Sequence, residues 1–245
     1  MFKNCNSLKY LDLSHLETLS VSSINHMFEG CTSLTSLDIS KFNTISIYES
    51  NSLFRDCESL KSLNLSSFYT GNFFDMSFMF QNCKSLEILD LSNFVTMIVT
   101  NFQSMFENCV KLTSIVISSF DTRNVYDMSY MFSGCESLKY LDLSNFYTLN
   151  TNLMSGMFYN CFSLTSINLD GFITRNVGDF SYMFYSCKSL KSLDLSSFSN
   201  ENCYQCEKIF DECYNMTLII NPNSCRILVK EIPEYVNSVF IDSFL

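Results

Sequence analysis

The sequence is poor in the residues that flex a chain or favour helices. Its 245 residues include six Gly, two Pro, no Trp and no Ala. Six glycines leave little material for the Gly-rich loops that bind phosphate groups. Helix-rich globular proteins rarely lack Ala entirely, because Ala is the best helix former. The missing residues therefore disfavour both a phosphate-binding loop and a predominantly helical fold.

Charge is also scarce, and one sign prevails. Charged residues make up 16% of the chain and hydrophobic residues 47%, so the chain is not intrinsically disordered. The 25 Asp and Glu outnumber the 15 Lys and Arg, which gives a formal net charge of −10. This balance argues against a nucleic acid or an anionic membrane as partner. No apolar run approaches the ~18 residues of a spanning helix, so no membrane insertion is expected.

An unbroken 26-residue repeat occupies most of the sequence. A Met-Phe pair or a close variant recurs at this step from Met1-Phe2 to Ile209-Phe210. Repeat positions are counted from the Met, and position 5 is always Cys. These cysteines are Cys5, Cys31, Cys57, Cys83, Cys109, Cys135, Cys161, Cys187 and Cys213. A fixed period of this length indicates one solenoid rather than two domains.

The first part of each repeat has a helical period. Met128, Met131, Phe132 and Cys135 are spaced i, i+3, i+4 and i+7, which is typical of one apolar face of a short helix. Asp127 precedes them as a good N-cap. Position 4 is Gly, Asn or Asp in the first seven copies, and these residues tolerate the left-handed conformation that ends a helix. The spacing predicts a helix of about two turns in each repeat.

The second part of each repeat alternates as a strand does. In the first copy Leu8 is followed by Leu11 and Leu13, so every second residue at the end of this run is apolar. Neither short element can bury its apolar face alone, and stacking identical units would bury both. We therefore predict one continuous parallel sheet, with helices on the opposite side. Its strands are expected at residues 11–13, 37–39, 63–65 and onward at the same step.

The complete pattern resembles a known repeat family. Residues 121–144 read DTRNVYDMSYMFSGCESLKYLDLS, and similar runs fill residues 1–220. This pattern closely resembles the BspA-like leucine-rich-repeat surface proteins. The resemblance implies an α/β horseshoe-like solenoid, with one parallel sheet on the concave side and short helices on the convex side. It also implies adhesion or partner binding at the surface of a cell, and it offers no catalytic residues.

One feature departs from the commoner leucine-rich repeats. Where those have an Asn ladder after the strand, this chain has Phe42, Phe68, Phe94 and their equivalents at position 16. The backbone of the turn must find other partners. The Ser at position 14 and the Thr at position 18 are the candidates.

The C-terminal residues leave the repeat. Asn221 stands where position 13 would be Leu, and Ser224 where position 16 would be Phe. Residues 221–224 read as a turn and residues 236–245 as a strand. A terminal unit must shield the apolar edge of the last repeat, so we interpret 1–220 as the array and 221–245 as a C-terminal cap.

The cysteines allow more than one interpretation. The nine at position 5 are expected to be reduced and buried, because a linear ladder cannot place four thiolates around one metal ion. Cys203, Cys206 and Cys225 are less clear. Cys203 and Cys206 replace the Val and Met of positions 21 and 24, which favours core packing. A disulfide near the cap, or a zinc site completed by Cys213, remains open.

No enzyme signature is present. His15 and His26 are the only histidines, and no HExxH, GxSxG or phosphate-binding loop occurs. We therefore expect no catalytic residues, no cofactor and no metal site.

The exposed face of the predicted strands carries the remaining signal. Position 12 points opposite to the buried Leu residues and is mostly Asp or Asn, and position 10 is Tyr in two copies. This pattern predicts an acidic, hydroxyl-rich groove for a protein or glycan partner. The alternative is a merely solvated face whose Asp and Ser side chains bond across strands. The candidate partner-binding residues are Tyr10, Asp12, Asp38, Asn64, Asp90, Tyr140, Asp142, Asn168 and Asp194.

These observations favour a non-enzymatic binding module at the cell surface or outside the cell. It would present its concave strand face to a protein or glycan. The alternative is an intracellular repeat scaffold, which the many unpaired thiols favour.

Overall fold

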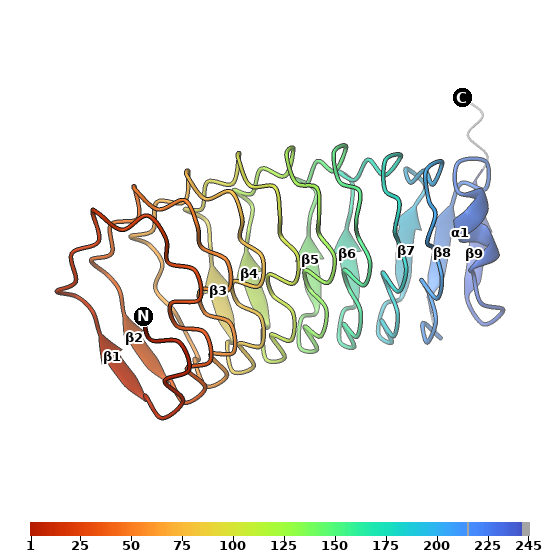
Figure 1. Ribbon diagram of the computed structural model, residues 1–245. Helices are drawn as coiled ribbons and strands as arrows, with labels where there is room; N and C mark the ends of the chain where they lie inside the picture. Colours follow the sequence, from red (N-terminus) through yellow and green to blue (C-terminus); the bar gives the residue numbers. More distant parts are fainter. Residues whose placement is uncertain (215, 242–245) are drawn as a thin grey trace.

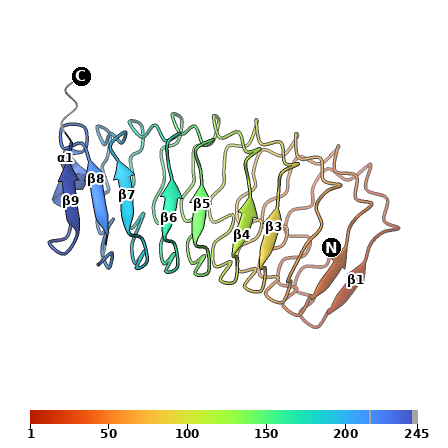
Figure 2. The same ribbon diagram turned by 180° about the vertical axis from the view of Figure 1, so that it is seen from behind.

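Each 26-residue repeat forms one coil of a parallel β-solenoid in the computed structural model, which describes residues 1–214 and 216–241. We number the coils 1 to 9 from the N-terminus, so coil 4 begins at Met79. Figure 1 and the reverse view in Figure 2 show the coils stacked in one open row that ends at β9. The predicted solenoid is confirmed. Contacts between neighbouring coils therefore provide the packing of the chain.

Short strands line one side of the row and pair only in parallel. They are β1 Tyr10–Asp12, β2 Ser36–Asp38, β3 Ile88–Asp90, β4 Ser114–Val116, β5 Tyr140–Asp142, β6 Ser166–Asn168, β7 Ser192–Leu195, β8 Thr217–Ile220 and β9 Asn237–Phe240. The predicted continuous sheet is wrong. The strands form four separate sheets, β1-β2, β3-β4, β5-β6 and β7-β8-β9, and no strand forms at 63–65. A three-residue strand makes few ladder bonds, so the packing of the whole coil decides which neighbours pair.

Tight turns, not helices, form the side that carries the Met-Phe pairs. The N–H groups of Met128, Tyr130 and Phe132 donate to carbonyls of the next coil at 2.8–2.9 Å. An α-helix would use these groups within its own turns. Tyr130 also has a left-handed φ of 57°, which does not fit a right-handed helix. The predicted helix in each repeat is absent from the described residues, so the α/β class overstates the helix content, although the parallel strands of that class are present. Helices about 10–12 Å wide would spread the coils apart on that side, whereas the tight turns let backbone N–H groups of one coil reach carbonyls of the next.

The helical period nevertheless identified the buried side chains. Met128, Met131, Phe132 and Cys135 are all fully buried. Position 4 is left-handed in every coil, as at Gly134 with φ 68°, although it ends a turn rather than a helix. Without wide helices on one side, the coils lack the usual cause of a closing horseshoe, and Figure 1 shows an extended row.

Ladders of identical side chains fill the interior. The position-2 rings stack from Phe2 to Phe210 at centroid distances of 5.3–6.2 Å. A second ladder at position 16 includes Phe42 and Phe68, whose centroids lie 6.3 Å apart. The Phe that replaces the usual Asn after the strand is therefore a core residue.

The position-5 cysteines form a hydrogen-bonded ladder. Each thiol from Cys31 to Cys213 donates to the position-2 carbonyl of the preceding coil at 3.1–3.3 Å. All nine are free, and eight are buried as expected. Cys5 differs because it lies at the open end of the row and is exposed. The ladder joins neighbouring coils while also filling core volume.

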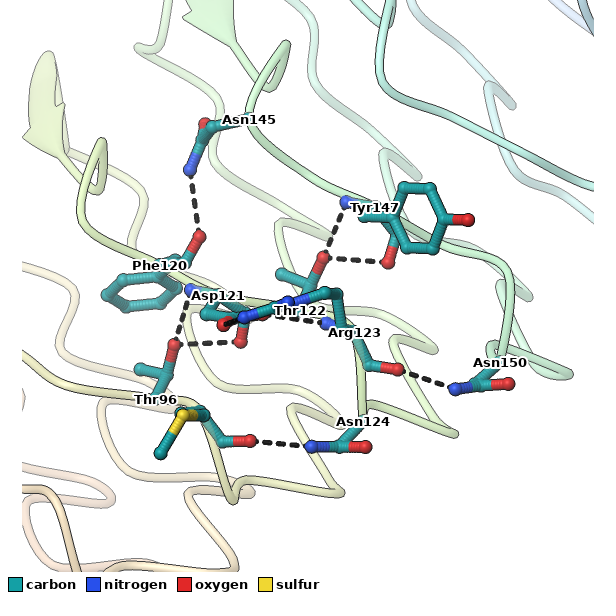
Figure 3. Close-up of polar contacts among 10 residues, drawn as sticks. Thr96, Phe120, Asp121, Thr122, Arg123, Asn124, Asn145, Tyr147 and Asn150 are labelled. Carbon is teal, nitrogen blue, oxygen red and sulfur yellow. Dashed lines mark hydrogen bonds and ion pairs between the residues drawn. The ribbon is translucent and has the colours of Figure 1, made fainter.

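Threonines at position 18 join the coils after the strand. The Thr96 hydroxyl donates to the Asp121 carbonyl at 2.9 Å and accepts from the Asp121 N–H at 2.7 Å (Figure 3). Thr122 bonds Tyr147 of the following coil in the same way. The expected role of Thr18 and its equivalents is confirmed. Position 15 also joins coils, which the sequence pattern did not indicate: the Asn145 amide donates to the Phe120 carbonyl at 3.0 Å.

The C-terminal segment continues the row with different elements. β8 pairs with β7 at a step of 25, so Ile220 rather than Asn221 occupies the inward place of position 13. Coil 9 has one residue fewer before its strand than the other coils, so the fixed step of 26 wrongly assigned Asn221 to position 13. Helix α1 (Arg226–Lys230) follows, and β9 then pairs with β8. β9 falls within the strand expected at 236–245, whose residues 242–245 lie outside the described residues. Within the described parts, no helix is long and apolar enough to cross a membrane.

Candidate functional site

The nine candidate partner-binding residues all lie on the strand side of the row. Tyr10 and Tyr140 leave 60% and 56% of their surface exposed. Asp38 and Asn168 are half-buried, and the other position-12 residues among the candidates are exposed. Strand pairing or a shared hollow joins eight of them in three groups: Tyr10, Asp12 and Asp38; Asn64 and Asp90; and Tyr140, Asp142 and Asn168. Asp194 lies on β7, in the coil that follows that of Asn168.

The side chains at position 12 have a local structural role. Oδ1 of Asp90 accepts the backbone N–H of Ser92 at 2.9 Å, and Oδ1 of Asp142 accepts that of Ser144 at 3.0 Å. The amide oxygen of Asn64 accepts an N–H in the same way. These are Asx turns, in which a side chain ends the strand by bonding the backbone two residues later. The bonds join residues of one coil and not neighbouring strands, which corrects the expected cross-strand bonding.

The same contacts keep the carboxylates ionised. The Ser92 N–H and then the Ser92 hydroxyl lower the pKa of Asp90 below its usual value of 3.8. For Asp142 the Ser144 N–H is again the first cause of a lowered pKa, followed by the Ser144 hydroxyl. A hydrogen bond to the charged form of a carboxyl stabilises that form. At neutral pH these two groups therefore carry negative charge on the strand side.

A groove opens where the strand pairing stops between β4 and β5. It has a volume of about 380 Å³ and is lined by residues 113–118, 139–142, 144 and 145. Val116 and Tyr140 give it apolar walls, and Asp142 and Lys139 add opposite charges. On the far side of the same two coils the turns remain joined, since Phe106 N–H donates to the Met131 carbonyl at 2.9 Å. The groove is therefore a gap between two neighbouring strands, and the solenoid continues across it through the turns of the other side.

The strand side is less acidic than positions 10 and 12 alone predict. Position 9 is Lys in four coils, and each of these side chains is exposed: Lys9, Lys61, Lys139 and Lys191. Lys139 lines the groove beside Asp142. Counting position 9 together with positions 10 and 12 would have identified this mixed charge. Val116, the one apolar residue among the eight repeats at position 12, was a second overlooked signal for the groove.

The cysteines near the C-terminus do not gather into a metal site. Cys203 and Cys206 form a disulfide, which was one of the open alternatives. Cys213 and Cys225 are free and donate separately to the carbonyls of Phe184 and Phe198, at 3.1 and 3.0 Å. In residues 1–214 and 216–241 no group of three or more His, Cys, Asp or Glu side chains could hold a metal ion.

The sequence matches one protein family over most of its length. The family is described as "Mycoplasma protein of unknown function, DUF285", and the matches cover residues 1–114, 75–198 and 111–223. The chain belongs to the DUF285 family. The DUF285 matches overlap one another, as expected for a chain whose units are interchangeable along the row. The DUF285 chain is therefore a member of a repeat family.

Other comparisons add little to the DUF285 assignment. A search of curated proteins gives no match. Among solved structures, the crystal structure of a TLR13–ssRNA13 complex is similar at 16% sequence identity and a TM-score of 0.31. That similarity covers 87% of this chain, and the chain spans 40% of the TLR13 chain.

Proposed function

We propose that this DUF285 chain is a non-enzymatic binding module of the BspA-like type that holds a protein partner on its strand side at a cell surface. The groove between β4 and β5 is the observation that supports this proposal. It combines an exposed Tyr, an exposed Val and two opposite charges in one recess. Tyr side chains are enriched at protein interfaces because they bury a large area at low entropic cost.

The charge of the groove suggests the chemistry of the partner. The Asp142 carboxylate stays ionised, and the chain as a whole carries a net charge of −10. A basic segment in an extended conformation suits this surface, because opposite charges steer association. Lys139 beside Asp142 would select a segment that also carries a hydrogen-bond acceptor.

Binding of three labelled probes to the purified chain tests the proposal. The probes are an extended twelve-residue peptide of Arg and Ser, its Glu/Ser counterpart, and a set of neutral oligosaccharides. We expect the Arg/Ser peptide to bind most tightly and to weaken as salt increases. Tyr140→Ser should weaken it at least about tenfold, equivalent to ~1.4 kcal/mol. Asp142→Asn retains the oxygen that accepts the Ser144 N–H, so it should reduce the salt dependence while keeping the turn.

Tyr10→Ser is the matched control. Tyr10 has the same repeat position and nearly the same exposure as Tyr140, but it lies on β1 in coil 1 and does not line the groove. It should leave binding unchanged. Equal loss in both Tyr variants, or no preference for the Arg/Ser peptide, would contradict a site at the groove. Preferential binding of an oligosaccharide would contradict a protein partner.

An intracellular scaffold is the second candidate, and the ten free thiols favour it. Burial raises the pKa of Cys83 and its neighbours well above the usual value, so these thiols also resist oxidation outside the cell. Labelling of intact cells with a membrane-impermeant amine reagent separates the two locations. A labelled chain supports the cell surface, and a chain labelled only after lysis supports the scaffold.

A further inference from the structure

The side of the row that follows the strands carries an exposed apolar surface on coils 1–4. We call it the loop-side face and define it by Leu19, Ile45, Tyr69 and Met97 in one line and Tyr48 and Phe74 in a second. Each of these side chains leaves between 45% and 56% of its surface exposed. Large contiguous apolar patches are rare on soluble monomers and mark interaction sites.

The first line contains one apolar side chain in each coil. Leu19, Ile45 and Met97 occupy position 19, where coil 3 has Gly71 instead. The Tyr69 ring lies over that glycine, because a Cβ on Gly71 would come within 2.6 Å of the Tyr69 hydroxyl oxygen. Tyr69 therefore supplies the apolar group that position 19 of coil 3 lacks. A hollow of about 390 Å³ adjoins the line and is lined by Ile45 and Tyr69 among others.

The line has a defined end. In coil 5, position 19 is Arg123, whose guanidinium binds the Asp121 carboxylate at 2.5 Å (Figure 3). In coil 5 an ion pair thus takes the place of the apolar side chain at position 19. The first line is therefore limited to coils 1–4, a length of about 14 Å at ~4.8 Å per strand spacing, whereas position 22 is again aromatic and exposed at Tyr126 of coil 5.

The stacking distances along the row lie on either side of the pitch of an α-helix. Stacked strands are about 4.8 Å apart, and the position-2 ring centroids of coils 1–4 follow one another at 5.8, 5.7 and 5.5 Å. An α-helix rises about 5.4 Å per turn. A helix lying along the row would therefore place one apolar side chain per turn between the side chains of successive coils. About three turns, or ~11 residues, would cover the face.

Acidic side chains surround this face. Residues 14–23, 40–49, 66–75 and 92–101 contain Glu17, Glu49 and Asp75 but only one Lys or Arg, Lys41, besides His15. Glu17 and Glu49 are exposed. A helix with Lys or Arg beside its apolar stripe would complement this charge.

We propose that the loop-side face of coils 1–4 docks a short, basic, amphipathic helix of a partner protein. The apolar stripe of that helix lies along the line from Leu19 to Met97, and its basic residues face Glu17 and Glu49. The face uses positions 17, 19 and 22 of coils 1–4, whereas the groove between β4 and β5 uses positions 9, 10 and 12 of coils 5 and 6. The two surfaces can therefore be tested separately.

The probe is a labelled fourteen-residue helical peptide of Leu and Lys, tested against the whole chain. Its Leu/Glu counterpart and a version with two central prolines are the comparison peptides. We expect the Leu/Lys peptide to bind at least about tenfold more tightly than either. The double variant Ile45→Ser/Met97→Ser should reduce its binding at least about tenfold. Ile88→Ser is the matched control, since Ile88 is an apolar residue 62% exposed on the strand side, and it should have no effect.

Four results would overturn the proposal. Equal binding of the proline peptide would contradict a helix, and equal binding of the Leu/Glu peptide would contradict a basic partner. Uptake of the chain by phosphatidylcholine vesicles that Ile45→Ser/Met97→Ser abolishes would assign the face to a membrane. A dimer in sedimentation that the same variant dissociates would assign it to a second copy. Unchanged binding in Tyr140→Ser would show that this site and the groove are independent, and thermal melts verify that each variant is folded.

Discussion

At the scale of single residues, the repeat selects side chains that do two tasks at once. Cys109 fills core volume and also donates its S–H to the Phe80 carbonyl at 3.3 Å. Ala would fill part of the volume without the bond, and Ser would bury a more polar group. Thr96 likewise satisfies both the N–H and the carbonyl of Asp121. The Cys of position 5 and the Thr of position 18 therefore each stabilise their own coil and the neighbouring one.

Thiol titration tests the burial of the cysteine ladder. Desolvation raises the pKa of the buried thiols, to about 12 for Cys161 and about 11 for Cys213. Only a thiolate reacts rapidly, so among the nine ladder cysteines the native chain should label quickly at exposed Cys5 alone. Denaturation without reductant should reveal ten thiols, and reduction should raise the count to the twelve of the sequence.

Rapid labelling of several ladder thiols in the native chain would contradict their burial. Twelve thiols without reductant would contradict the disulfide between Cys203 and Cys206.

At the scale of elements, the sequence predicted burial better than backbone conformation. The period of Met128, Met131 and Phe132 correctly marks the inward side, because both a helix and a run of tight turns return the chain after a few residues. The backbone N–H groups of this run can bond within the run, as in a helix, or to the next coil. Which of the two occurs depends on how closely the coils stack, and the sequence of one repeat does not determine that distance. The strand side was predictable from alternation. The groove was not, since it arises from where short strands fail to pair.

Substitutions at the left-handed positions distinguish turns from helices. Ser104 is buried with φ 53°. A left-handed conformation costs a non-Gly residue ~1–2 kcal/mol, and Gly costs ~0.5–1 kcal/mol of backbone entropy. Ser104→Gly should therefore stabilise the fold by about 0.5–1 kcal/mol in urea melts. Gly134→Ala is the reverse case, with φ 68°, and should cost at least about 1–2 kcal/mol. If these residues lay in a helix, Ser104→Gly would destabilise the fold and Gly134→Ala would stabilise it.

At the scale of the whole molecule, stability is distributed along one dimension. Each coil contacts only its neighbours, and the two sides of the row are joined unequally. The turn side bonds every coil to the next, as Phe80 N–H does to the Met105 carbonyl at 2.9 Å. The strand side is joined within sheets such as β3-β4 and β5-β6 and opens between them. The interface between coils 5 and 6 therefore relies on its turns and ring ladders more than the interface between coils 4 and 5.

Substitution of Phe106 tests whether the interface between coils 5 and 6 relies on the ring ladder. Phe106 belongs to coil 5, whose strand β4 borders the groove. Its ring is fully buried, 5.7 Å from that of Phe80 and 5.4 Å from that of Phe132. Phe106→Ala should cost about 3–5 kcal/mol, since it leaves a cavity in both ladder contacts. Coils 5 and 6 have no paired strands that could compensate for the lost ring contact. Urea unfolding should therefore separate into two phases.

Asp90→Asn is the control for this change, because the Asn amide oxygen can still accept the Ser92 N–H, as that of Asn64 accepts the Ser66 N–H. Its unfolding midpoint should match that of the unaltered chain. Hydrogen exchange would then locate the weaker phase on one side of the groove. If Phe106→Ala unfolds in one transition with little loss, the ring ladder does not carry the interface between coils 5 and 6. If Asp90→Asn is as damaging as Phe106→Ala, the charge at position 12 holds the fold together, and it cannot be free to bind a partner.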